Sequence, residues 1–242
     1  MMVLASSDIH VPRFSTDFLA SFSTTVKENQ PAILLLAGDI VNKGDPSSLG
    51  SFLDELKKMY TGRVIACQGN EEYEEKFDDI RAASRNMIEW LVNEIGVYDV
   101  LGSRLVVLGT KGALERPTYW QRTHVNDMWK IRSTQIQTIK SKLNELRSVQ
   151  AEYKIVLSHY SPTRATMLGE REKMWPEMGY PDFEDEIRTG GFNIWVHGHI
   201  HRGAIEFVTI GDVKVYNVAF PARKKPIWVL RLSLLDCGVE QG

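Results

Sequence analysis

The stretch Val196-His197-Gly198-His199-Ile200-His201 carries three of the chain's six histidines at alternate positions, directly after the apolar run 192–196. Alternate side chains of a strand share one face, so a loop that leaves the strand end can keep these rings in one cavity. Imidazole is the commonest metal ligand in proteins, and a histidine without a metal needs its own hydrogen-bonding partner. The stretch therefore indicates either a metal site or a polar loop of separately satisfied histidines.

Other side chains that can bind metals also follow apolar runs. They are Asp8 and His10 after residues 2–7, Asp39 after 32–37, Asn70 after 63–68, and His159 after 153–157. Singly, each signal is weak, because Gly-Asp and Gly-Asn pairs usually mark turns and a lone histidine is usually hydrogen-bonded. The carboxyl ends of strands line the ligand crevice of open α/β sheets, so we expect the whole set to converge there.

The chemistry of this set is specific. Four histidines, two aspartates and one asparagine form a mixed nitrogen and oxygen donor set, which suits Mn, Fe, Zn, Co or Ni. Seven ligands are too many for one ion and suit two ions that share a carboxylate. Two ions about 4 Å apart can activate a hydroxide and bind phosphoryl oxygens. The set therefore fits two divalent transition-metal ions, and such a pair could act on a phosphate ester.

The elements that would position these residues alternate along the chain. Helices are expected over residues 15–29, capped by Ser15 or Thr16, and from Pro46 onward. Further helices are expected through Met87, Trp90, Leu91 and Ile95, and over 130–149, where an apolar stripe begins at Ile131. Strands that alternate with helices indicate right-handed βαβ crossovers and a parallel sheet covered on both faces. We expect both Trp90 and Ile131 to be buried.

Three segments do not follow this alternation. Residues 120–129 are predicted to be irregular, and residues 204–233 carry three β-rich runs that suggest antiparallel strands. Residues 161–181 form a long segment without a clean period, and loops of that length are usually functional or disordered. We expect this loop to form a wall or lid that selects the substrate, through Met167, Met174, Trp175 and Met178.

Composition narrows the class of protein. The chain has 242 residues, 43% of them hydrophobic, and a formal net charge of −2. We expect one domain over residues 1–242, with no electrostatic case for nucleic-acid or anionic-membrane binding. No apolar run approaches the roughly 20 residues that span a bilayer, and no secretory signal opens the chain, so we expect a cytoplasmic protein. Cys67 and Cys237 are expected to be structural or neutral, and the oligomeric state, including a homo-oligomer, stays open.

Five blocks together resemble the calcineurin-like metallophosphoesterase family, including its archaeal-type phosphoesterases. They are Asp8-x-His10, Gly38-Asp39, Gly69-Asn70, His159 and Gly198-His199-x-His201, in the family's order. The resemblance implies an α/β fold, a four-layer α/β/β/α sandwich with mixed central β-sheets flanked by helices. It implies one ion held by Asp8, His10 and His201, and a second ion held by Asn70, His159 and His199. Asp39 would bridge the two ions.

The same resemblance implies a reaction. A hydroxide between the ions would attack the phosphorus of a phosphomonoester or phosphodiester, without a covalent phosphoenzyme. The residues expected to be catalytic are Asp39, Asn70, Glu71 and His199. Arg13 and Arg164 follow the first and fourth blocks and are expected to contact the substrate phosphate. His197 is expected to be a supporting or core histidine, and the run Arg223-Lys224-Lys225 a solvated loop.

One position departs from the family pattern. The asparagine block usually continues with histidine and then an acidic residue, whereas here it reads Gly69-Asn70-Glu71-Glu72. The family histidine commonly assists the leaving group, and Glu71 cannot supply its positive charge. Burial could raise the pKa of Glu71 enough to make it a proton donor, although nearby cations act in the opposite direction. His197, His124 and a metal-bound water are the alternatives.

Two competing functions fit the sequence less well. A partner-binding scaffold on the same fold, such as the retromer subunit, has typically lost ligands, whereas all seven are present here. A nuclease of the double-strand-break-repair type would carry capping domains and a DNA-binding surface, whereas this chain is short and slightly acidic. The leading hypothesis is a dinuclear-metal phosphoesterase.

Overall fold

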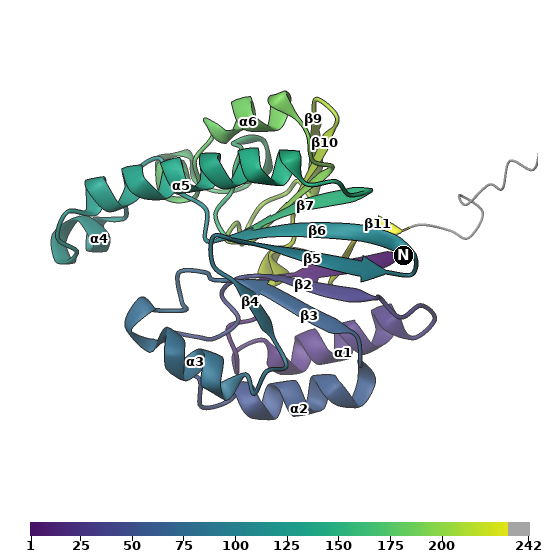
Figure 1. Ribbon diagram of the computed structural model, residues 1–242. Helices are drawn as coiled ribbons and strands as arrows, with labels where there is room; N and C mark the ends of the chain where they lie inside the picture. The colour runs from purple at the N-terminus through teal and green to yellow at the C-terminus, as the bar shows by residue number, and fades with distance from the viewer. Residues whose placement is uncertain (232–242) are drawn as a thin grey trace, which may run out of the picture.

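Two β-sheets pack face to face, and helices cover the outer face of each (Figure 1). The structure is a computed structural model, and it describes residues 1–231. The arrangement confirms the expected α/β fold, with two mixed sheets flanked by helices. That residues 1–242 act as one domain stays a prediction.

The first sheet carries the N-terminal strands in the order β11-β1-β2-β3-β4. Its strands are β1 (Met2–Ser6), β2 (Ile33–Ala37), β3 (Arg63–Cys67), β4 (Glu89–Leu91) and β11 (Ile227–Arg231). Strands β1 to β4 are parallel, and β11 pairs antiparallel with β1. Alternate residues of β2 enter different cores: Leu34 and Leu36 face the helices, while Ile33 and Leu35 face the other sheet. Burial on both faces explains why this strand is uniformly apolar.

The second sheet has the order β5-β6-β7-β8-β10-β9. Its strands are β5 (Glu94–Val100), β6 (Ser103–Thr110), β7 (Tyr153–Ser158), β8 (Ile194–His197), β9 (Phe207–Ile210) and β10 (Val213–Asn217). The inner strands β6, β7, β8 and β10 are parallel, and β5 and β9 close the two edges as antiparallel strands. The C-terminal β-rich runs are therefore antiparallel as expected, except that β10 is parallel to β8. Residues 232–233 of the third run and Cys237 lie outside the described residues.

Helices form the two outer layers. They are α1 (Ser15–Val26), α2 (Leu49–Met59), α3 (Phe77–Ala83), α4 (Tyr119–His124), α5 (Met128–Ser148), α6 (Phe183–Thr189) and α7 (Phe220–Arg223), with 3-10 turns η1 (Glu74–Lys76), η2 (Ala165–Met167) and η3 (Glu172–Glu177). Phe18 and Phe22 of α1 pack with α2 on the first sheet. Ile139 and Leu143 of α5 pack on the second sheet beside Trp195. Among residues 1–231, no helix is both long and apolar enough to cross a bilayer.

The prediction of a helix through residues 87–95 is wrong. The segment forms β4 in the first sheet and β5 in the second. Asn86 and Asn93 have positive φ angles of 59° and 55°, which a right-handed helix cannot contain. Trp90 is buried as expected, but on a strand. The spacing of Met87, Trp90, Leu91 and Ile95 fits a helix in isolation, and pairing with β3 decides the structure instead.

Helix ends and loops differ from the expectations in smaller ways. Helix α1 starts after Phe14 without a side-chain cap, and α2 starts at Leu49, three residues after Pro46. Residues 120–129 are largely helical rather than irregular, because Thr118 and Gln121 form a capping box at the start of α4. Ile131 is 47% exposed rather than buried. The N-terminal end of α5, next to α4, extends beyond the body of the molecule, so the first turns of α5 have no sheet beneath them (Figure 1).

Candidate metal centre

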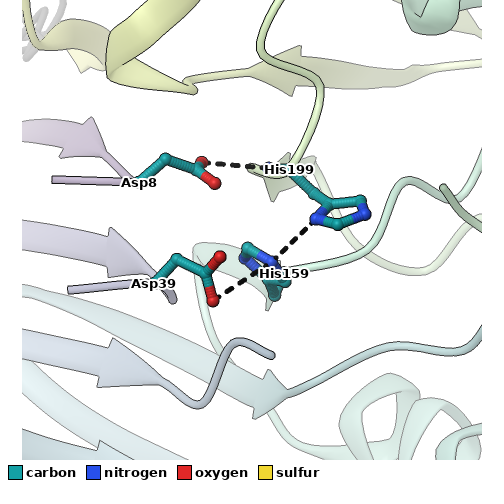
Figure 2. Close-up of side chains that lie close together, drawn as sticks. All are labelled: Asp8, Asp39, His159 and His199. Atoms are coloured by element: carbon teal, nitrogen blue, oxygen red, sulfur yellow. Dashed lines mark hydrogen bonds and ion pairs between the residues drawn. The ribbon is translucent and has the colours of Figure 1, made fainter. Parts of the chain in front are cut away.

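The carboxyl ends of strands from both sheets meet at one place. Asp8 follows β1 and Asp39 follows β2 in the first sheet, while His159 follows β7 and His199 follows β8 in the second. Figure 2 shows these four side chains directed toward one another. Their ligand atoms all lie within 4.8 Å of one another, and those of Asp8, His10 and His201 form a second such group. Two groups that share a residue are the arrangement that two neighbouring ions need.

Asn70 completes the set of seven predicted ligands. Its Oδ1 lies 3.0 Å from His159 Nε2. Asp8 is the residue shared by the two groups, whereas the sequence pointed to Asp39 as the bridge. The Asp39 carboxylate nevertheless lies between the groups, with Oδ1 3.4 Å from His159 Nε2 and Oδ2 3.9 Å from His10 Nε2. Asp39 as the bridging ligand stays a prediction.

The tautomer of His159 gives the most direct sign of a cation. Its Nδ1 lies 2.9 Å from the carbonyl oxygen of Ala37, so Nδ1 carries the proton and Nε2 carries a lone pair. Around that Nε2 lie Asn70 Oδ1 at 3.0 Å, His199 Nδ1 at 3.1 Å and Asp39 Oδ1. A lone pair cannot donate a hydrogen bond to acceptor oxygens. A cation among these atoms would satisfy them together, and the donor set fits a divalent transition metal.

His10 supplies the same sign in the second group. The residue is 5% exposed, and within residues 1–231 neither of its ring nitrogens has a hydrogen-bonding partner. Its Nε2 lies 4.0 Å from Asp8 Oδ1 and 3.9 Å from Asp39 Oδ2, too far for a hydrogen bond. Buried polar atoms are rarely left unpaired. A metal ion between the imidazole and the two carboxylates would give this ring a partner.

Burial and charge set the protonation states of the site. Burial lowers the pKa of His159 to about 4 and that of His199 to about 3, so both rings are neutral and free to ligate near pH 7. Burial together with the charges of Glu72 and Asp8 raises the pKa of Asp39 well above its usual range. Burial also acts to raise the pKa of Asp8, but the hydrogen bond and charge of His201 outweigh it. Asp39 therefore needs a nearby cation to remain ionised in this buried cluster.

Four of the predicted ligands have an unusual backbone conformation. The φ angles of Asp8, His10, Asp39 and His199 are 56°, 45°, 50° and 67°. Residues other than glycine seldom adopt this left-handed region, at a cost of order 1–3 kcal/mol each. Such strain concentrates at functional sites, where the surrounding structure holds it. Sharp turns at the strand ends aim these side chains into the space between the sheets.

Glycines allow the ligand loops to approach one another. A Cβ atom on Gly198 would lie 2.6 Å from Asp8 Oδ2, and one on Gly69 would collide with the Asp39 carboxylate. The glycine in each of these two motifs is therefore a requirement of close packing between the ligand loops.

Glu72 is a buried residue of the site that the sequence did not reveal. Its Oε2 accepts hydrogen bonds from the backbone N–H groups of Asp39 at 2.8 Å and Gly69 at 2.7 Å. Its Oε1 accepts from those of Ile40 at 2.7 Å and Val41 at 3.0 Å. Burial raises the pKa of Glu72, and these four donors oppose that effect. The carboxylate ties the Asp39 loop to the Asn70 loop and fixes the separation of two predicted ligands.

Glu71 has a different environment. Its backbone N–H donates to Asp39 Oδ1 at 2.7 Å, and its Oε2 accepts the backbone N–H of Lys43 at 2.5 Å. The side chain thereby supports the turn at Lys43, where φ is 53°. A role for Glu71 as proton donor stays a prediction.

The remaining predicted residues lie around the cluster. Arg13 is exposed and lies over the Phe14 ring, with Cζ 4.9 Å from the ring centroid. Arg164 is also exposed, and its Nη2 donates to Glu115 Oε2 at 2.7 Å. His197 is fully buried with its Nε2 2.9 Å from Thr166 Oγ1, in agreement with a supporting role. Their contacts with substrate stay predictions.

The loop over residues 161–181 is partly ordered by η2 and η3. Met167 is fully buried, so the interpretation that it forms part of an open wall is wrong. Met174 is 38% exposed, and Trp175 and Met178 are half-buried. His124 is exposed and stacks on Trp120 with ring centroids 5.0 Å apart. These residues other than Met167 are still available for the roles expected of them.

Comparison with known proteins agrees with this geometry. Residues 1–203 match the family model described as calcineurin-like phosphoesterase. The fold is similar to that of phosphopantetheinyl hydrolase from Mycobacterium tuberculosis, with a TM-score of 0.65, 12% identity and 96% of each chain covered. It is also similar to TT1561 of Thermus thermophilus, with a TM-score of 0.56, 14% identity, and 94% of this chain and 97% of that chain covered. No curated protein matches the sequence.

Proposed function

The chain belongs to the calcineurin-like phosphoesterase family, and on that premise we propose that it hydrolyses a phosphomonoester or phosphodiester with two divalent metal ions. The observation that carries the proposal is the environment of His159 Nε2. A lone pair there faces the oxygens of Asn70 and Asp39 in a buried space, with His199 Nδ1 3.1 Å away, and a cation is what such a set binds.

The ligand sets follow from the two groups of side chains. We assign Asp8, His10 and His201 to one ion, and Asn70, His159 and His199 to the other, with Asp39 between them. When bound, such a pair of ions supplies a hydroxide nucleophile near neutral pH and stabilises charge on the phosphoryl oxygens. Mn is the first candidate to test, and the mixed nitrogen and oxygen donors suit Fe, Zn, Co and Ni as well.

The chain's own residues provide the positioning. Glu72 fixes the Asp39 and Asn70 loops relative to each other, and Ser7 Oγ donates to Asp8 Oδ2 at 2.5 Å while the His199 N–H donates to the same oxygen at 2.9 Å. These bonds hold Asp8 against the histidine loop before any substrate arrives. Preorganised groups of this kind need no rearrangement during the reaction.

The test is hydrolysis of p-nitrophenyl phosphate and bis(p-nitrophenyl) phosphate by the Mn-loaded protein. Asp39→Asn and His159→Ala are each expected to lower kcat/KM by at least about 100-fold, because each disrupts a ligand set. Asp212→Asn is the matched control, because Asp212 is exposed in a turn between β9 and β10. Protein that binds two ions per chain and hydrolyses neither ester would contradict the proposal and favour the scaffold interpretation.

A further inference from the structure

Beside the candidate metal centre, two cations lie over one aromatic ring. Arg13 Cζ is 4.9 Å and Lys224 Nζ is 5.7 Å from the centroid of the Phe14 ring. The Phe14 ring in turn lies 6.3 Å from the ring of His10, a predicted metal ligand. Residues 13 and 224, from opposite ends of the chain, thus both place a cation against the Phe14 ring.

The position of Lys224 is fixed to the metal-site loops. Helix α7 begins where the Phe220 N–H donates to the Ser7 carbonyl at 3.0 Å, one residue before Asp8. It ends where Arg223 Nη2 donates to the Gly203 carbonyl, two residues after His201. Lys224 follows immediately, and its N–H donates to the Phe220 carbonyl at 2.8 Å. Lys224 and Lys225 are exposed, as expected of a solvated run, but the Lys224 backbone is held at the end of α7.

The backbone at Lys224 is also constrained. The residue caps α7 in the left-handed conformation, with φ 59° and ψ 9°. Glycine or asparagine is the usual residue there, because a side chain carries a steric cost. Despite that cost, Lys224 occupies this position, and its ammonium group lies over the Phe14 ring.

Neither cation is neutralised by a carboxylate within residues 1–231, since the ion pairs there involve other residues. Elsewhere on the surface, Arg63, Arg85 and Arg104 each pair with an acidic side chain at 2.9–3.0 Å. Unpaired cations held over a ring beside a phosphate site are suited to bind a second anion.

We propose that Arg13 and Lys224, held over Phe14, form a second anion-binding subsite beside the metal centre. The inference rests on the proposed function and narrows it. The substrate class is a phosphate ester that carries a further anionic group, such as a carboxylate or another phosphate, a few bonds from the phosphorus. Arg13 then contacts this distal group rather than the scissile phosphate.

The experiment uses pairs of non-hydrolysable phosphonates. Propylphosphonate and 3-phosphonopropionate differ in a terminal methyl group against a carboxylate, and longer pairs extend the reach by one or two methylenes. Calorimetry on the Mn-loaded full chain gives the ratio of the two Kd values. The wild type is expected to prefer the carboxylate in at least one pair by about threefold to tenfold, a preference that weakens at 0.5 M salt.

The variants separate this subsite from the metal centre. Lys224→Met, which retains chain length but not charge, is expected to remove most of the preference. Lys225→Met, at the exposed neighbouring position, is expected to retain it. A wild type without preference in any pair, or equal loss in both variants, overturns the subsite while leaving the hydrolysis of p-nitrophenyl phosphate as evidence for the proposed function. A protein that neither hydrolyses the esters nor binds any phosphonate overturns both the subsite and the proposed function.

Discussion

The hydrogen bonds of Glu72 allow a quantitative prediction for Glu72→Gln. The carboxylate accepts four backbone N–H bonds, two on each oxygen, and the side chain is fully buried. Glutamine has nearly the same shape but replaces one acceptor oxygen with an NH₂ group. Two buried backbone donors then face another donor and lose their partners.

The size of the effect follows from that count. An unpaired buried donor costs about 1–3 kcal/mol, so two cost about 2–6 kcal/mol. Removal of a buried charge offsets part of this, because burial raises the pKa of Glu72 in the folded protein. We expect a net loss of about 2–4 kcal/mol in the free energy of unfolding. For a chain of this size, that is a fall in Tm of about 5–15 °C.

Calorimetry and urea denaturation of the metal-free protein measure the effect, with Glu71→Gln as the matched control. Glu71 accepts a single backbone N–H bond, from Lys43, and an amide oxygen can keep it. The loss in the free energy of unfolding of Glu71→Gln is expected to stay below about 1 kcal/mol. Because Glu72 connects the Asp39 and Asn70 loops, Glu72→Gln is also expected to weaken Mn binding. Equal Tm values for the two variants would refute the assigned role of Glu72.

The remaining predictions concern pH and packing. Burial acts to lower the pKa of His201, but the hydrogen bond and charge of Asp8 outweigh it and raise that pKa above its ordinary value, so a proton competes with metal for this ring as pH falls. Mn affinity measured by competition with a chelator should fall about tenfold per pH unit for each proton displaced, and a flat profile from pH 8 to 6 would contradict this. Ile139→Ala on α5 should cost about 2–5 kcal/mol in urea denaturation, because Ile139 is fully buried. Ile131→Ala on the same helix should cost less than about 1 kcal/mol, because Ile131 is 47% exposed, and similar losses would show that the projecting end of α5 is covered.

The sequence indicated the strand ends and their ligands because both signals are local. An apolar run of six residues such as 32–37, bounded by proline and by a Gly-Asp pair, favours a buried strand that ends at a sharp turn. Parallel strands bring their carboxyl ends to the same edge of a sheet, so Asp8 and Asp39 could be expected to meet, whereas His199 reaches them from the second sheet. The backbone N–H of His199 indeed donates to Asp8 Oδ2 at 2.9 Å.

Prediction from the sequence failed where contacts between distant residues decide the structure. Met87, Trp90 and Leu91 have spacing that suits a helix, but β3 offers an open strand edge and Asn93 turns the chain into the other sheet. The turn-forming asparagines were the available signal. Glu72 lies in an acidic run that looks uniformly solvated, and only the folded loops show that it is buried among four backbone donors. Its place in the asparagine block, where relatives carry an acidic residue, was the one hint.

Anomalous diffraction from crystals of the Mn-loaded protein tests the central claim most directly. The account predicts two peaks at the Mn absorption edge, one among Asp8, His10 and His201 and one among Asn70, His159 and His199, with Asp39 between them. In crystals of His159→Ala, the second peak should be lost or strongly weakened. A single peak, peaks away from these side chains, or two peaks unaffected by the loss of His159 would contradict the account.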